Sequence, residues 1–453
     1  MQRFCGLVSW TVPAAILLNC GGCFFSERSF PMDPRTVVRP AVPAPSDPAD
    51  PPTTRQWLVA AHKILKPILP RHPKPALLTE ELTDERGRPV DLVSRFAIRT
   101  WGLESIWTNF LGLCYSAQAS CTRTESAAYT PLPGFADVWI PVADDLQLAG
   151  RLGLSRTADG RIADADCIVI LPGLHGGQNV LRTRDLAMAL RQSGFHVLTL
   201  DLRGQGLTQA RYPASKYTWA ALETDDLLRV SDWLTRQPHI RRTGLVGYSW
   251  GANQALLVPW REARPEGDPS VTPALAQHLR PLPPGRRYQA GVIAFSPILQ
   301  FETLMDELET PQAAFFHPVR AGLQTTVREW MIGEHYPNPT GSVRNLIQYT
   351  GVQYPHSVDD SLQFLRFLPY KDLPAYDKLG AARMPVLIVH AADDPIAPAQ
   401  TIAELFARVS NPNAAAIVLP SGGHIGFGPY ATAWYYSLIL RFFDPTCGPR
   451  PRT

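Results

Sequence analysis

The sequence has few of the features that mark a metal-binding or nucleic-acid-binding protein. Its seven cysteines include a single Cys-x-x-Cys, formed by Cys20 and Cys23, so the second pair that a structural zinc site needs is missing. The formal net charge is only +3, too small for the concentrated basic surface that nucleic acid requires. We therefore expect neither a metal nor a nucleic-acid partner. The hydrophobic fraction of 45% is instead that of an ordinary globular core.

The first apolar segment is shorter than the roughly 20 residues of a membrane span, although no charged residue follows it before Glu27. Residues 4–18, which follow Arg3, are apolar over about 15 residues, as in the core of an export signal. The four residues ending at Cys20 resemble a bacterial lipobox, in which the cysteine is acylated, although Asn19 is atypical there. Residues 1–25 are thus interpreted as an export or lipoprotein signal, with an uncleaved anchor or a buried helix as alternatives. We expect the protein in the cell envelope, membrane-anchored, periplasmic or secreted.

A proline-rich stretch follows this signal. Residues 31–52 contain eight prolines, which fix φ and remove backbone donors, so residues 26–53 are predicted to form an extended linker. In an oxidising compartment, Cys114 and Cys121 would be close enough in sequence to pair.

Two regions are predicted beyond the linker. Residues 54–130 have helical periodicity at 56–65 and 103–114, and we interpret them as a helical N-terminal extension. Residues 131–446 begin with a β-hairpin and then alternate short apolar runs with longer amphipathic segments, which is typical of an α/β fold with a mostly parallel central sheet flanked by helices. The runs predicted as strands after the hairpin are 167–171, 196–201, 244–247, 291–295, 385–390 and 416–419.

Two insertions interrupt this alternation. Residues 261–287 are charged and proline-rich and are expected to form a surface loop. Residues 300–380 are too long for a plain connection, and we interpret them as a helical cap insertion. This segment is rich in aromatic residues: Phe315, Phe316, Trp330, Tyr336, Tyr349, Tyr354, Phe364 and Phe367.

Ser249 is the candidate nucleophile. It stands in Gly-Tyr-Ser-Trp-Gly at 247–251, between an apolar strand and a helix-forming run. This strand–turn–helix context is the nucleophile elbow, in which two glycines let the strand and the helix approach while the serine is exposed on a strained turn. A serine hydroxyl needs a base and an orienting acid to react at neutral pH.

Both partners follow Ser249 in the order that such a fold uses. Asp394 is the candidate acid, because Pro-Ile-Ala-Pro follows it in the turn after a predicted strand; Asp393 is the alternative. A metal site formed by His390 with these two carboxylates is a weaker interpretation. His424 is the candidate base, since it lies in a glycine-rich loop after the last predicted strand.

An oxyanion hole is the remaining requirement, because negative charge develops on the carbonyl oxygen in the transition state. The loop at 172–177 follows the strand at which one donor of this hole normally lies. The backbone N–H groups of Leu174 and Trp250 are the candidate donors. His175 is expected near the rim of the pocket or in a packing role.

These motifs together resemble the α/β-hydrolase superfamily, and within it the YheT-like abhydrolase-domain group. The matching segments are PGLHGG at 172–177, DLRGQG at 201–206, ETDDL at 223–227, GYSWGAN at 247–253, ADDP at 392–395 and GGHIGF at 422–427. The resemblance implies an α/β-hydrolase fold with a Ser249, Asp394 and His424 triad. It also implies carboxylesterase, lipid-active or acyltransferase activity. Trp250 departs from the leucine usual after the nucleophile.

The function expected from these observations is cofactor-free hydrolysis of a small carboxylic ester by a serine esterase. The aromatic cap favours an apolar acyl group in that substrate. Acyl transfer to an alcohol by the same triad and a non-catalytic binding protein are the alternatives. A dehalogenase or an epoxide hydrolase is excluded, because each needs aspartate where Ser249 stands.

Overall fold

The computed structural model describes residues 52–69, 76–78, 108–109, 129–174, 176–264, 268–269, 271–277, 279–309, 323–325, 327–328, 331–332, 338–347 and 358–449. The predicted export signal and nearly all of the proline-rich linker lie outside these residues, as do Cys20, Cys114 and Cys121. Within them, we find no helix whose length and apolar character would suit a membrane span.

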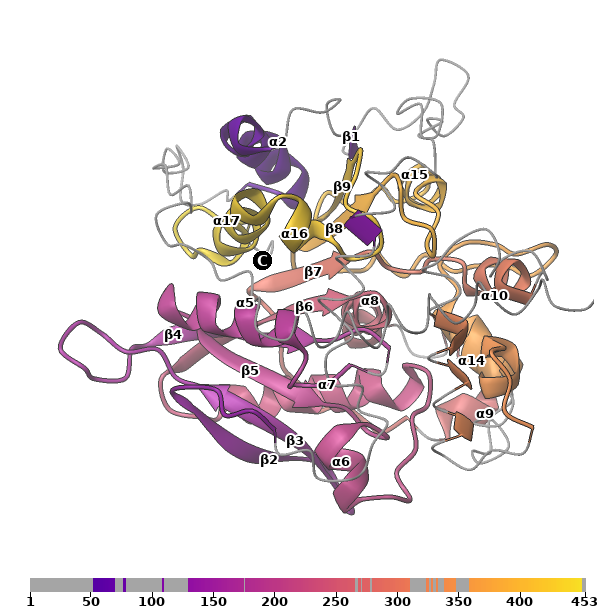
Figure 1. Cartoon of the computed structure of the whole chain (residues 1–453), viewed down its shortest axis with the longest axis horizontal. Coiled ribbons are helices and arrows are strands. Elements are labelled where there is room, and N and C mark those ends of the chain that lie inside the picture. The colour runs from indigo at the N-terminus through magenta and orange to yellow at the C-terminus, as the bar shows by residue number, and fades with distance from the viewer. Residues whose placement is uncertain are drawn as a thin grey trace, which may run out of the picture.

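A nine-stranded sheet forms the centre of the molecule, in the order β1-β9-β8-β7-β6-β4-β5-β3-β2 (Figure 1). An antiparallel hairpin, β2 (Phe135–Ala143) and β3 (Leu146–Gly153), begins the described fold, as predicted. Six strands then run parallel: β4 (Ala165–Leu171), β5 (His196–Asp201), β6 (Ile240–Tyr248), β7 (Gly291–Phe295), β8 (Val386–Ala391) and β9 (Ala414–Leu419). Each overlaps a run that the sequence predicts, shifted by one residue at β8, because strands buried on both faces are continuously apolar.

Helices cover both faces of this sheet. One face packs against α2 (Thr54–Leu65), α5 (Leu181–Gln192) and α17 (Thr432–Phe443). The other packs against α7 (Ala221–Thr235), α8 (Trp250–Ala263) and α15 (Gln400–Phe406). Side chains of one strand alternate between the two cores: Ile168 belongs to the first and Val169 to the second. A mostly parallel sheet between two helical layers is the predicted α/β-hydrolase fold.

The helix α2 and the short strand β1 of the N-terminal extension both pack onto this fold. On α2, the ring of Trp57 packs edge-on against Phe442 of α17, with 5.3 Å between ring centroids. The short strand β1 (Ala76–Leu78) pairs antiparallel with β9 and so lies at one edge of the sheet. Helical periodicity predicts only helices for residues 54–130, because a three-residue strand is too short to produce a pattern of its own.

The predicted cap is described in part. Its helices α10 (Phe301–Glu309) and α14 (Val358–Leu365) lie, with α9 (Pro273–Ala276) from the preceding insertion, on the side toward which β6 and β7 point (Figure 1). A buried ion pair between Glu302 and Arg366, with 2.6 Å between charged atoms, holds α10 to the end of α14. Phe364 and Phe367 are buried there. The other aromatic residues named for this segment, Phe315, Phe316, Trp330, Tyr336, Tyr349 and Tyr354, lie outside the described residues.

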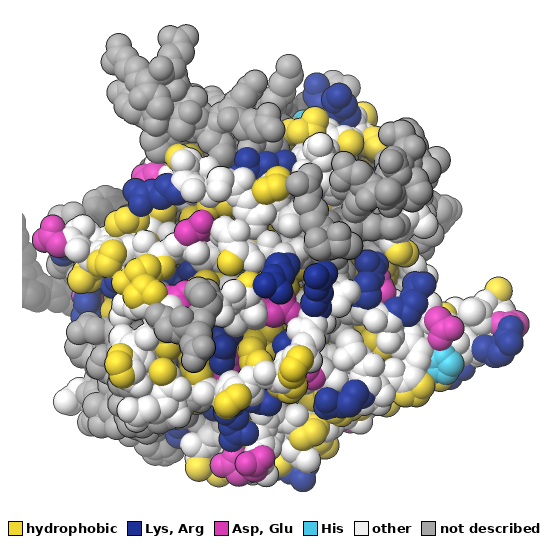
Figure 2. Space-filling model, turned by 180° about the vertical axis from the view of Figure 1, so that it is seen from behind, with side chains coloured by type: hydrophobic (Ala, Val, Ile, Leu, Met, Phe, Trp, Pro, Cys, Tyr) yellow, Lys and Arg dark blue, Asp and Glu magenta, His cyan; other side chains and the backbone are white. Residues whose placement is uncertain are grey.

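Charged side chains of both signs are spread over the face seen in Figure 2, with apolar side chains between them. Several arginines are also neutralised locally, as in the pair of Arg203 with Asp226 at 2.7 Å and of Arg261 with Asp225 at 2.7 Å. The short elements not yet named are η1 (Lys66–Ile68), α6 (Gly206–Arg211) and α16 (Phe427–Tyr430).

Candidate active site

Ser249 stands between β6 and α8 in a backbone conformation that side chains rarely adopt, with φ of 52° and ψ of −115°. Its N–H donates to the carbonyl oxygen of Phe295 in the neighbouring β7, at 2.8 Å. Two residues earlier, a Cβ on Gly247 would lie 2.2 Å from the carbonyl oxygen of Gly251, so only glycine fits where the strand meets the helix. This tight turn is the nucleophile elbow that the motif predicts.

His424 and Asp394 lie at the same edge of the sheet as Ser249. Each follows the carboxyl end of a parallel strand, His424 after β9 and Asp394 after β8. The Nε2 atom of His424 is 2.7 Å from Oγ of Ser249, and its Nδ1 atom is 2.9 Å from Oδ2 of Asp394. A carboxylate only accepts hydrogen bonds, so Nδ1 carries the proton and Nε2 is left to accept from the serine hydroxyl. The structure thus brings together the three residues that the sequence singles out.

The carboxylate of Asp394 is held by the turn that follows it. Its Oδ1 atom accepts from the N–H groups of Ile396 and Ala397, both at 2.9 Å, and its side chain is fully buried. Burial on its own would raise the pKa of Asp394, but His424 and the N–H donors together hold that pKa below its usual value. This carboxylate therefore stays ionised and can stabilise a positive charge on the imidazole.

Asp393, the alternative acid, contacts the histidine loop elsewhere. Its carboxylate accepts from the hydroxyl of Ser421 at 2.8 Å and from the N–H of Gly423 at 2.7 Å. Its neighbour Asp394 is the residue that reaches the imidazole. Asp393 thus bonds to the backbone and a side chain of the loop that carries His424.

His390 is buried beneath this turn. Its Nε2–H donates to the carbonyl oxygen of Ala397 at 2.8 Å, and burial lowers the pKa of the ring. A neutral imidazole in this position supports the turn of Asp394 by a hydrogen bond. Across the described part of the chain, no three histidine, cysteine, aspartate or glutamate side chains are grouped to hold a metal ion.

The two candidate oxyanion donors lie on either side of the nucleophile. Trp250 is the first residue of α8, and the first N–H groups of an α-helix have no acceptor within the helix. Leu174 belongs to the loop after β4, where a Cβ on Gly173 would lie 3.3 Å from Cβ of Ser249. Both backbone segments therefore border the serine. His175 lies outside the described residues.

Asp201 opens the DLRGQG segment but is not among the predicted site residues; it is a buried carboxylate bonded to the residue that follows the candidate oxyanion loop. Asp201, at the end of β5, accepts from the N–H of Gln178 at 2.9 Å, from its side-chain amide at 3.0 Å, and from the hydroxyl of Tyr129 at 2.8 Å. It also accepts from the N–H of Leu207 at 3.0 Å, and burial raises its pKa. The signal that identifies it is a charged residue closing an apolar strand.

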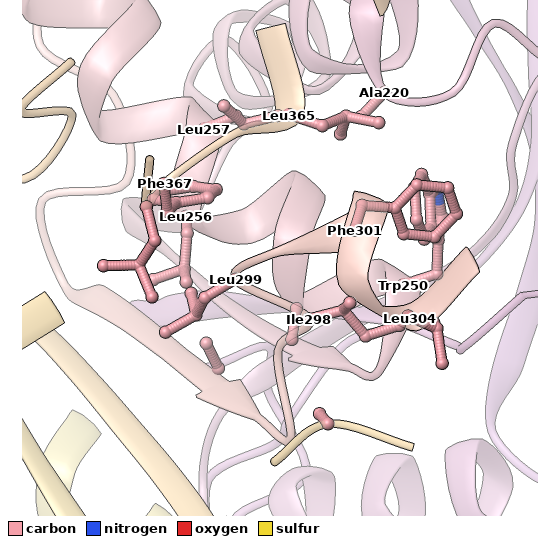
Figure 3. Packing of buried hydrophobic residues seen from close by; sticks show 14 of the residues in the cluster. Ala220, Trp250, Leu256, Leu257, Ile298, Leu299, Phe301, Leu304, Leu365 and Phe367 are labelled. Atoms are coloured by element: carbon pink, nitrogen blue, oxygen red, sulfur yellow. The ribbon is translucent and has the colours of Figure 1, made fainter. Parts of the chain in front are cut away.

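Aromatic side chains surround the residue after the nucleophile. The ring of Trp250 is buried between Trp219, at 5.1 Å between centroids, and Phe301 of α10, at 4.8 Å. Phe301 and Trp250 lie together in Figure 3, with Ile298 and Leu304 nearby. The side chain of Asn253 adds a polar link, accepting at 2.8 Å from the N–H of Ile298. The first cap helix is therefore fastened directly to the helix of the elbow.

The comparison with protein-family models agrees with this architecture. A family model described as the alpha/beta hydrolase family matches residues 168–435, more than half of the 453-residue chain. Among solved structures, the chain is similar to the 2,6-dihydroxy-pseudo-oxynicotine hydrolase, at 16% identity over 73% of this chain and 74% of that one, with a TM-score of 0.46. It is also similar to the esterase Pf2001 of Pyrococcus furiosus, at 16% identity over 69% and 93% of the two chains, with a TM-score of 0.41.

A third similar structure is Est1E from Butyrivibrio proteoclasticus with ferulic acid bound, at 14% identity over 67% of this chain and 98% of that one, with a TM-score of 0.39. With TM-scores below 0.5, these likenesses indicate nothing about the activity of this chain.

Proposed function

The chain belongs to the alpha/beta hydrolase family, and on that premise we propose that it hydrolyses carboxylic esters by a serine acyl-enzyme mechanism. The observation that carries the proposal is the unbroken chain of contacts from Ser249 through His424 to Asp394, at 2.7 and 2.9 Å. The backbone of Ser249, with φ of 52°, supports it further, because such a turn holds the serine side chain away from the strand and the helix that flank it, as nucleophilic attack requires.

In the first half of the proposed reaction, Oγ of Ser249 attacks the ester carbonyl carbon while its proton passes to Nε2 of His424. Asp394 stabilises the imidazolium, and the N–H groups of Leu174 and Trp250 donate to the oxyanion. Collapse of the tetrahedral intermediate releases the alcohol, which takes the proton from Nε2. In the second half, water attacks the acyl-enzyme, gives a proton to Nε2, and the acid leaves as Oγ of Ser249 is reprotonated.

We propose an apolar acyl group for the substrate. The aromatic residues of the predicted cap at 300–380 support this choice, since apolar surface next to the reacting centre favours an apolar partner. Within the family, the ordered motifs support membership of the YheT-like group.

The decisive experiment uses p-nitrophenyl esters of increasing chain length, with Ser249→Ala as the control. Wild type should hydrolyse them and react with a fluorophosphonate probe at Ser249. Ser249→Ala should lose at least about 10³-fold in rate and should not be labelled, given the size of triad effects. A variant that kept its activity, or labelling at another residue, would rule out the assignment. Added alcohol in the same assay, with product analysis, reports acyl transfer.

Export of the enzyme is a separate proposal, supported by the apolar segment 4–18 and by the prolines that follow it. A mature chain that begins at Cys20 and carries acyl groups would identify a lipoprotein, whereas an intact N-terminus in the membrane fraction would identify an uncleaved anchor. A full-length chain in the soluble cytoplasmic fraction would contradict export.

A further inference from the structure

Asn109 bridges the two loops that carry the acid and the base of the proposed triad. It lies 284 residues before Asp393 in the chain, yet its side-chain amide donates to the carbonyl oxygen of Asp393 at 3.3 Å. The amide oxygen of the same side chain accepts from the backbone N–H of His424 at 2.8 Å. Asn109 is 1% exposed, so these two bonds are made away from water.

The segment of Asn109 fits closely against the histidine loop. A Cβ on Gly423 would lie 2.4 Å from the amide oxygen of Asn109, so residue 423 has to be glycine for the asparagine to approach. The preceding residue, Thr108, is also buried, and its carbonyl oxygen lies 2.7 Å from where a Cβ on Gly426 would be. Such contact along successive residues indicates a docked segment of chain.

Two consecutive backbone N–H groups of the histidine loop are therefore held by side chains from elsewhere. Gly423 donates to the carboxylate of Asp393, and His424 donates to Asn109. Gly422 and Gly423 both have positive φ, so this loop has little conformational preference of its own. The position of the imidazole therefore depends on hydrogen bonds from residues outside this loop.

We propose that Asn109 is a positioning residue for His424, and hence that the N-terminal extension is a working part of the catalytic unit. This inference rests on the proposed function. Asn109 bonds to the backbone N–H of His424 and to the turn of Asp393, so it acts on the imidazole through them. Because a misplacement of about 1 Å in a catalytic group costs on the order of 10²-fold in rate, loss of this bridge should lower kcat.

The test compares Asn109→Ala with Asn411→Ala. Asn411 is a matched control, because its side-chain amide donates to the carbonyl oxygens of Leu379 and Ala382, both at 2.8 Å. It precedes β9, whereas His424 follows that strand, so the two lie at opposite ends of it. Both variants should lower Tm. Only Asn109→Ala should lower kcat, by about 10- to 100-fold, with KM changed by less than about 3-fold.

A second measurement does not need activity. Backbone hydrogen exchange of the peptide covering residues 421–427 should become faster in Asn109→Ala and stay unchanged in Asn411→Ala, because only the first loses the acceptor of the His424 N–H. Asn109→Asp keeps the shape of the side chain and an acceptor for that N–H, but it has no donor to Asp393 and places a buried carboxylate beside that carbonyl oxygen. It should also lower kcat, while its exchange at this peptide remains closer to wild type.

The outcomes separate the two proposals. Equal kcat losses in Asn109→Ala and Asn411→Ala, or unchanged exchange at 421–427, would overturn the positioning role even if wild type is an active esterase. Wild type that neither hydrolyses esters nor reacts with a fluorophosphonate would instead remove the proposed function. The exchange experiment would still show whether Asn109 holds the loop.

Discussion

Asp393 and Asp394 are adjacent in the chain, but they contact the loop of His424 in different ways. Asp394 bonds to Nδ1 of the imidazole ring, and Asp393 bonds to the backbone N–H of Gly423. One carboxylate therefore orients the ring and the other fixes the backbone that carries it. Their substitutions should consequently affect different properties.

Asp394→Asn should lower kcat by about 10³- to 10⁴-fold, because an amide cannot both keep the required tautomer of His424 and stabilise its positive charge. Asp393→Asn retains an acceptor oxygen for the loop, so it should lower kcat by less than about 10-fold and mainly lower Tm. Steady-state kinetics and thermal unfolding of both variants give the comparison. Equal kcat losses, or a larger loss at position 393, would place the acid one residue earlier.

The contact between Trp250 and Phe301 should be measurable as a coupling energy. Edge-on aromatic pairs contribute about 0.5–1.5 kcal/mol beyond the area that they bury. The losses in free energy of unfolding caused by Trp250→Leu and Phe301→Leu should therefore not add up in the double variant. Urea unfolding should show a difference of about that amount. As the control, Phe301→Leu with Phe442→Leu should be additive, since Phe442 lies in the core on the other face of the sheet. Additive losses for Trp250→Leu and Phe301→Leu would mean that the contact between these two rings does not stabilise the packing of the cap helix.

Lys378 should make stability depend on pH. Its Nζ atom donates to the carbonyl oxygen of Arg366 at 2.5 Å, and burial lowers its pKa from 10.5 to about 7. Between these two values the unfolded chain binds a proton that the folded chain does not, so the free energy of unfolding rises with pH in that window. The slope approaches about 1.4 kcal/mol per pH unit. Below pH 7 Lys378 is protonated in both the folded and the unfolded chain, so its destabilising effect no longer changes with pH.

Lys378→Met removes this titration. Relative to wild type, the variant should be most stable at pH 7 and below, and the difference should shrink as pH rises to 10. Urea unfolding at pH 7, 8, 9 and 10 measures it. Lys371→Met is the control, because Lys371 is exposed and should add no such slope in this range. A difference that does not vary with pH would show that Lys378 is charged in the folded protein.

Asp201 should affect the reaction through the oxyanion loop. Asp201→Ala leaves the N–H group of Gln178, which is buried, and that of Leu207, which is partly buried, without their acceptor. An unsatisfied buried N–H group costs about 1–3 kcal/mol. Because Gln178 follows the loop of Leu174, we also expect kcat to fall by about 10-fold or more. Asp166→Ala is the matched control: Asp166 is equally buried and pairs with Arg242 at 2.6 Å, but it lies at the start of β4. If both variants are less stable but keep the kcat of wild type, Asp201 has only a structural role.

The central fold could be predicted from the sequence because local patterns determine it. The six parallel strands are five to nine residues long and each contains a short apolar run. The triad residues occupy turns with distinctive neighbours, as Asp394 does before Pro395. Asn109 and Asp201 could not be assigned a role in this way. Their partners are distant in the chain, and no local pattern distinguishes a bridging asparagine from a solvated one. The strand β1 is likewise recognisable only from its pairing with β9.

The edge position of β1 has a consequence for solubility. Its three residues, 76–78, pair with 416–418 of β9. Without β1, β9 would end the sheet with its N–H and carbonyl groups unpaired. An exposed, apolar edge strand is a template for pairing with other chains. A protein shortened to the region of the hydrolase motifs would keep Ser249 and His424, but β9 would be an unpaired edge strand. We expect such a protein to self-associate on expression.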